Sequence, residues 1–125
     1  MESIAEFVYD ESSEIDMKDD YMYFIDLSLL QCTKKDYGDK SKVKAHNQAL
    51  GKLSILKEKM KENLDLDEME VLLEHSDERV VINAASFCLE IGAHKDKSCI
   101  VLKKIIEASK DETFVFAARN VLNSQ

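Results

Sequence analysis

The residues that could perform chemistry are few and widely spaced. The three histidines, His46, His75 and His94, form neither an HExxH nor an H-x-E motif, and no glycine-rich loop could hold a phosphate. Cys88, His94 and Cys99 come closest to a metal site, but their spacing fits no zinc template and a fourth ligand is not evident. The sequence therefore predicts no enzyme, no metal site and no cofactor.

The cysteines and histidines are better explained as structural residues. Cys88 lies on an apolar helical stripe, where cysteine behaves as a small hydrophobic residue, and the same role is predicted for Cys32. His75 is expected to favour a helix C-terminus. An odd number of cysteines without a CxxC pair, an acidic start and no apolar run near 18 residues predict a cytoplasmic protein that does not enter a membrane.

Polar residues predict a binding surface instead. After Ser76, one set recurs at spacings of four, three and four residues and would form a single stripe opposite the core: Arg79, Asn83, Ser86 and Glu90. Phe116 and Arg119 occupy equivalent positions near the C-terminus, and an exposed aromatic residue beside an arginine is typical of binding hot spots. The alternative is a solvated face with Phe116 packed under the C-terminus.

The charge is uneven along the chain. The net charge is −8, and acidic residues gather in residues 1–20 and 65–78, whereas residues 41–64 carry six lysines against two glutamates. Two anionic blocks argue against nucleic-acid binding, although Lys42, Lys44 and Lys52 could form a small basic patch. An acidic surface attracts basic protein partners, or it only keeps the protein soluble.

Length and composition predict one all-α domain. The chain has 125 residues, 45% of them hydrophobic and 34% charged, with three glycines and no proline. That balance excludes the disordered, membrane-spanning and disulfide-rich classes. Helical periodicity and cap signals predict about six helices, over residues 16–35, 41–63, 66–75, 77–91, 98–109 and 112–125, with residues 1–15 as a loosely packed arm.

Several details follow from this pattern. The first helix is apolar nearly all round and is expected to be buried between neighbours, with Lys34 and Lys35 in its last turn. Ser41, Asp65, Ser76 and Asp111 are the predicted helix caps. Asn47 is expected to be a buried amide, and the methionines are expected to fill the core: Met17, Met22, Met60 and Met69.

A repeat links the two halves of the C-terminal region. A shift of about 34 residues places 71–72 on 105–106 and 77–78 on 111–112, and a shift of 33 places 84–85 on 117–118. Such a period in a helical chain predicts a right-handed stack of helical hairpins, and the segment 77–85 resembles the HEAT pattern. The arginine that bridges HEAT repeats is replaced by Val81 and Val115, so an Asp–Arg ladder is not expected.

A wider resemblance covers the chain from about Tyr23 onward. Its motifs are a Gly-Asp turn, an asparagine in the long helix, a His-x-Asp-Glu junction and an alanine pair, at residues 38–40, 45–53, 72–78 and 84–85. In this order they resemble the bacterial domain of unknown function 2019 family. The resemblance implies a HEAT-like helical fold of the kind found among immunity proteins encoded beside bacterial toxins.

These observations lead to one functional hypothesis and one alternative. The first is an immunity protein that binds a basic toxin domain, such as a nuclease, and occludes its active or substrate-binding site. Charge would come from Asp67, Glu70, Glu74 and Glu78, and shape from Asn83, Glu90, Phe116 and Arg119. The alternative is a HEAT-like scaffold or regulator with no toxin partner.

Overall fold

The described part of the protein is entirely helical. The computed structural model describes the backbone of residues 13–125 and the side chains from residue 20 onward. This range contains no strand, one short 3₁₀ turn and six α-helices: α1 (Ser13–Leu29), η1 (Lys34–Asp36), α2 (Lys40–Glu62), α3 (Leu66–Leu73), α4 (Glu78–Ile91), α5 (Lys95–Ala108) and α6 (Glu112–Asn123). The predicted all-α class is confirmed, whereas most of the predicted arm over residues 1–15 lies outside the described residues.

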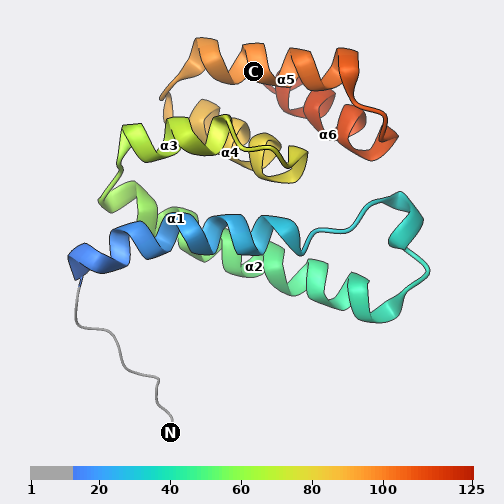
Figure 1. The fold of residues 1–125 in the computed structure, drawn as a ribbon, viewed down its shortest axis with the longest axis horizontal. Coiled ribbons are helices and arrows are strands. Elements are labelled where there is room, and N and C mark those ends of the chain that lie inside the picture. The colour runs from blue at the N-terminus through green and yellow to red at the C-terminus, as the bar shows by residue number, and fades with distance from the viewer. Residues whose placement is uncertain (1–12) are drawn as a thin grey trace, which may run out of the picture.

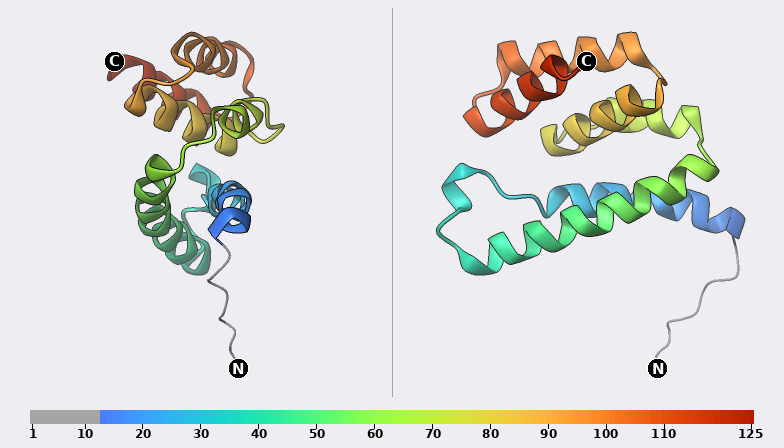
Figure 2. Two further views of the ribbon diagram at one scale, coloured as in Figure 1. Left: turned by 90° about the vertical axis from the view of Figure 1, so that its left-hand side faces the viewer. Right: turned by 180° about the vertical axis from the view of Figure 1, so that it is seen from behind.

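The helices form three stacked antiparallel hairpins in two layers (Figures 1 and 2). The hairpins are α1–α2, α3–α4 and α5–α6, and the middle one lies between the other two. Figure 2 shows α1, α3 and α5 in one layer and α2, α4 and α6 in the other. The connections α1–α2, α3–α4 and α5–α6 therefore all lie at the same end of the stack.

Four helices begin at an aspartate whose carboxylate accepts backbone N–H groups of the first turn: Asp39, Asp65, Asp77 and Asp111. The predictions for Asp65 and Asp111 are confirmed. The predicted caps Ser41 and Ser76 are wrong, because Asp39 already accepts from the N–H of Ser41 and Asp77 is the N-cap of α4.

The end of the first helix also differs from the prediction. Helix α1 stops at Leu29, and the next residues leave the helical path to make other hydrogen bonds. The N–H of Cys32 donates to Nδ1 of His46 on α2, at 3.0 Å. Lys34 and Lys35 belong to η1, a separate turn closed by a capping box between Thr33 and Asp36, so they do not lie in the last turn of α1.

The turn between α4 and α5 is shorter than predicted. Gly92 ends α4 with φ +77°, and His94 is also left-handed with φ +46°. The Nε2 atom of His94 lies 2.8 Å from the carbonyl oxygen of Leu66, which ties this turn to the start of α3. Helix α5 therefore begins at Lys95, three residues before the predicted start.

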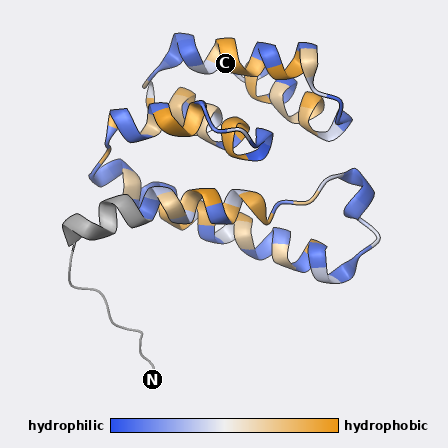
Figure 3. Ribbon diagram, viewed as in Figure 1, coloured by the Kyte–Doolittle hydropathy of each residue, from blue (hydrophilic) through white to orange (hydrophobic). Residues whose placement is uncertain are grey.

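Apolar side chains from all six helices form one core, and Figure 3 shows hydrophobic residues recurring along the helices that supply it. Phe24 of α1 and Phe87 of α4 are fully buried, with ring centroids 6.4 Å apart, and they join the first hairpin to the second. Ala84 and Ala85 have no exposed surface, which permits close approach of neighbouring helices. Cys32 and Cys88 are buried, as predicted.

Three core predictions are wrong. Among the residues with described side chains, helix α1 is buried on one face, whereas Met22 and Tyr23 on its other side are 61% and 42% exposed. Asn47 is exposed on α2. Of the four methionines, Met60 and Met69 are in the core, and the side chain of Met17 lies outside the described residues.

Replacing Gly51 or Gly92 by alanine should change the free energy of unfolding in opposite directions. Gly51 lies in the exposed middle of α2, where an added Cβ would meet no atom within 4 Å, so Gly51→Ala should raise the free energy of unfolding by about 0.5–1 kcal/mol. Gly92→Ala should lower it by about 1 kcal/mol, because its φ of +77° disfavours a side chain. Urea denaturation of both variants checks this, and a loss of stability in both would contradict it.

Candidate functional site

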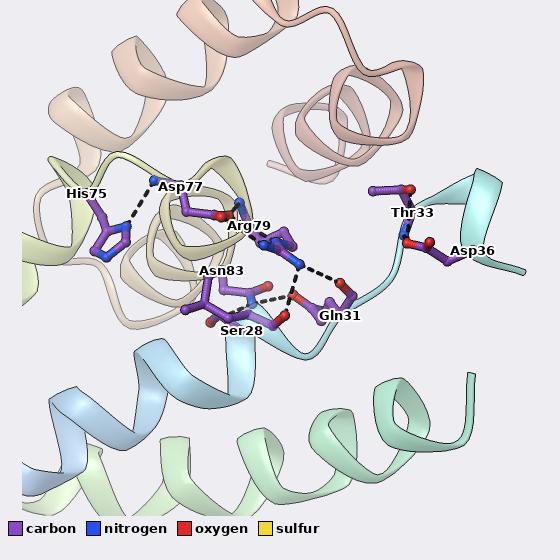
Figure 4. A network of polar contacts seen from close by, with 9 residues as sticks. Ser28, Gln31, Thr33, Asp36, His75, Asp77, Arg79 and Asn83 are labelled. Atoms are coloured by element: carbon purple, nitrogen blue, oxygen red, sulfur yellow. Dashed lines mark hydrogen bonds and ion pairs between the residues drawn. The ribbon is translucent and has the colours of Figure 1, made fainter. Parts of the chain in front are cut away.

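Arg79 joins the first two hairpins near the common end of the stack (Figure 4). Its Nε and Nη2 atoms donate to the two carboxylate oxygens of Asp77, at 3.0 and 2.8 Å. Its Nη1 atom donates to the carbonyl oxygens of Leu29 and Gln31, at 2.9 and 3.0 Å. The guanidinium therefore satisfies carbonyls that the end of α1 leaves without helical partners.

Asn83 makes a second connection one helical turn further along α4. Its Nδ2 atom donates to Oγ of Ser28 at 2.9 Å and to Oε1 of Gln31 at 2.6 Å. Ser28 is fully buried and donates its own proton to the carbonyl of Phe24. Arg79 and Asn83 thus contact the first hairpin, and the prediction that they belong to a solvent-facing stripe is wrong.

The contact between Asp77 and Arg79 favours the charged form of both side chains. The hydrogen bond from Arg79, more than any other contact, holds the pKa of the Asp77 carboxyl below its ordinary value of 3.8. The same bond raises the pKa of Arg79 above its ordinary value. Both groups are therefore charged at neutral pH.

A groove opens above this network, between the α1–α2 connection and the start of α6. The backbone N–H of Lys34 donates to Oγ1 of Thr113 at 2.9 Å and bridges the first and third hairpins. An inner pocket of about 140 Å³ has α4 as its floor and is lined by Gln31, Cys32, Tyr37, His46, Arg79, Ile82, Asn83, Thr113, Phe114 and Ala117.

Two outer pockets continue the groove toward solvent. One, of about 310 Å³, is lined by Lys34, Tyr37, Glu112, Thr113 and Phe116. The other, of about 480 Å³, is lined by Thr33, Lys34, Lys35, Lys110, Asp111, Glu112 and Thr113. All three pockets are lined by Thr113, so they adjoin one another, and they are referred to together as the groove.

Two exposed aromatic rings line the groove. Tyr37 is 58% exposed and Phe116 is 66% exposed, and both line the 310 Å³ pocket. The prediction that Phe116 is exposed is confirmed by this arrangement. Tyr37 was not predicted, because it follows a short 3₁₀ turn where helical periodicity gives no signal.

The predicted acidic residues lie elsewhere and contact other parts of the chain. Lys97 of α5 forms ion pairs with Glu70, at 3.1 Å, and with Glu74. This lysine lowers the pKa of Glu70, chiefly through their hydrogen bond.

Glu78 and Glu90 also make contacts within the molecule. A carboxylate oxygen of Glu78 accepts a hydrogen bond from the hydroxyl of Ser109 at 2.8 Å. Glu90 of α4 pairs with Lys61 of α2 at 3.4 Å. Of the predicted partner-binding residues, the groove brings together only Asn83, in its floor, and Phe116, while Asp67 and Arg119 are exposed outside its lining.

The described residues include no cluster of metal-ligating side chains and no membrane-spanning helix. Among them, no three His, Cys, Asp or Glu side chains gather closely enough to hold a metal ion. None of the described helices combines the length and the apolar character that crossing a membrane requires.

Comparison with known proteins gives no match, whether to a family model, to a curated protein or to a solved structure. The resemblance to the domain of unknown function 2019 family therefore stays a prediction, and the function has to be argued from the groove.

The two arginines of the chain form a matched pair for testing the connection between hairpins. Arg79→Met should lower the free energy of unfolding by about 2–3 kcal/mol, because Asp77 and two carbonyls lose a charged donor. Arg119→Met, at an exposed position, should change it by less than about 0.5 kcal/mol. Urea denaturation measures both, and equal effects would contradict the proposed role of Arg79.

The ion pair also predicts a pH dependence. Because the folded-state pKa of Asp77 is lowered, its charge stabilises the fold above about pH 4, and this contribution is lost as the pH falls through the folded pKa. Asp77→Asn keeps a good N-cap but not the charge, so it should cost about 1 kcal/mol at neutral pH. The difference between the two proteins in urea denaturation should shrink toward acid pH, and a constant difference would contradict this.

Proposed function

We propose that this chain is a protein-binding module that holds a segment of its partner in the groove between the α1–α2 connection and α6. The observation that supports this most directly is the exposure of Tyr37 and Phe116 at the same pocket. Large aromatic side chains at the centre of an interface contribute much of its binding energy. Among the described residues, neither of the other two pockets has a comparable pair of exposed aromatic rings.

Hydrogen bonds hold both sides of the groove in place. The Lys34–Thr113 hydrogen bond and the Thr33–Asp36 capping box fix the α1–α2 connection against α6. Arg79 and Asn83 fix its other end on α4. A rigid groove loses little conformational entropy when it binds, which favours affinity.

The narrower form of the proposal is that the partner is a cognate bacterial toxin, which the chain neutralises as an immunity protein. The net charge of −8 and the family resemblance of the sequence support this form. A basic nuclease would be attracted to such a protein. Glu70 and Glu74 contribute less to binding than their charge suggests, because both pair with Lys97. The groove is therefore the better candidate for the contact.

Co-expression with the toxic region of a toxin-like protein encoded directly upstream tests the proposal through cell survival and co-purification. The wild-type chain should rescue growth and form a stable complex. Tyr37→Ala combined with Phe116→Ala should weaken the complex by at least about 30-fold, the effect of losing a hot spot worth about 2 kcal/mol.

Two variants outside the groove control for the loss of exposed apolar surface. Tyr23→Ala on α1 and Ile55→Ala on α2 remove similarly exposed side chains and should leave the affinity unchanged. A double groove variant that still binds and protects like wild type would exclude the groove. Failure of a well-folded wild-type chain to rescue any such toxin would exclude immunity and favour the scaffold alternative.

A further inference from the structure

We propose that the inner pocket binds a carboxylate side chain, an aspartate or glutamate carried by the partner segment that Tyr37 and Phe116 hold. This inference rests on the proposed function and names the chemistry that the partner must present. The carboxylate would accept hydrogen bonds from Nε2 of His46 and from the side-chain amide of Gln31, since both residues line the pocket.

The tautomer of His46 is set by its contact with the α1–α2 connection. Its Nδ1 atom accepts the backbone N–H of Cys32 at 3.0 Å, and a ring nitrogen that accepts carries no proton. The neutral ring must therefore carry its proton on Nε2. Among the described residues, no group accepts a hydrogen bond from this Nε2–H.

The orientation of the Gln31 amide follows from a chain of hydrogen bonds. Ser28 donates its hydroxyl proton to the carbonyl of Phe24, so its Oγ can only accept from Asn83. The Asn83 atom that faces Ser28 is therefore Nδ2, and Nδ2 also donates to Gln31, which must present Oε1. The NH₂ group of Gln31 is then left as a donor without a partner among the described residues.

The size of the pocket fits one acidic side chain. With a volume of about 140 Å³, the pocket has room for the side chain of an aspartate or glutamate. The outer pockets, of about 310 and 480 Å³, leave room for the neighbouring residues of an extended segment.

The charges around the groove favour a carboxylate over an uncharged amide. The negative charge of Asp77 is paired with Arg79, and that of Asp36 with Lys42. Three lysines of the outer groove, Lys34, Lys35 and Lys110, have no ion pair with another described residue, against the carboxylates of Asp111 and Glu112. Asn83 Oδ1 is an acceptor that would favour an amide, so glutamine is the relevant competitor.

Selection from displayed peptide libraries tests this chemistry with the intact chain. Three random libraries of about nine residues differ only in a fixed central glutamate, glutamine or lysine. Binders should emerge from the glutamate library, with affinities at least about 10-fold higher than those of the same peptides carrying glutamine at that position. The selected peptides should compete with the toxin and lose binding to the Tyr37→Ala, Phe116→Ala variant.

His46→Asn separates recognition from folding. The asparagine oxygen can replace Nδ1 as acceptor for Cys32, while the donor at the Nε2 position is lost, so affinity for the glutamate peptides should fall about 10-fold or more. His75→Asn is the matched control, because His75 Nδ1 accepts the N–H of Asp77 in the same way and lies outside the pocket lining. The affinity of the His75→Asn variant for the glutamate peptides should stay at the wild-type value.

Each other outcome overturns the inference. Equal binding of the glutamate and glutamine peptides would show an amide pocket, and unchanged binding by His46→Asn would exclude the imidazole donor. Peptides that bind in the groove but show no preference for an acidic residue would exclude the carboxylate proposal and would be consistent with the proposed function. Absence of binders from all three libraries would also overturn the carboxylate proposal. Co-expression with the toxin tests the proposed function separately.

Discussion

The fork of hydrogen bonds made by Arg79 is the contact on which the rest of the site depends. It joins the N-terminus of α4, where Asp77 is the cap, to the carbonyl groups that follow the end of α1. The Leu29 carbonyl lies at the negative end of the α1 dipole, so a cation placed there is favoured by charge as well as by geometry. Because the pairing fixes where the chain leaves α1, it also fixes the α1–α2 connection that forms one side of the groove.

That connection has little regular structure, and its polar groups are satisfied by three different helices. His46 of α2 accepts from Cys32, Arg79 of α4 donates to Gln31, and Thr113 of α6 accepts from Lys34. A backbone segment without helical partners must find such bonds elsewhere when it is partly buried. The same bonds that satisfy the segment also hold the first, second and third hairpins in register, so the groove is a consequence of how the fold ends its first helix.

The helices could be predicted from the sequence, whereas the groove could not. Aspartate caps mark helix starts through local interactions, which is why α3 and α6 begin at their predicted residues. Helix α4 begins one residue after its predicted start, because its cap is Asp77 and not Ser76. Periodicity assigned Arg79 and Asn83 to the face opposite the α4 core, but it carries no information on which neighbouring hairpin covers that face. Tyr37 lies in a turn with no period at all, so only the tertiary structure brings it beside Phe116.

An acidic protein can still bind an acidic side chain, because its net charge acts on a partner at long range and the charges inside the groove act at contact. A net charge of −8 acts on an approaching partner from outside the molecule, and salt screens it over about 8 Å. Inside the groove the near charges decide, and there Lys34, Lys35 and Lys110 outnumber the carboxylates. Glu70 and Glu74 are paired with Lys97 and contribute little at contact. A partner that fits both proposals would have a basic surface overall and would place one acidic side chain in the inner pocket and apolar neighbours against Tyr37 and Phe116.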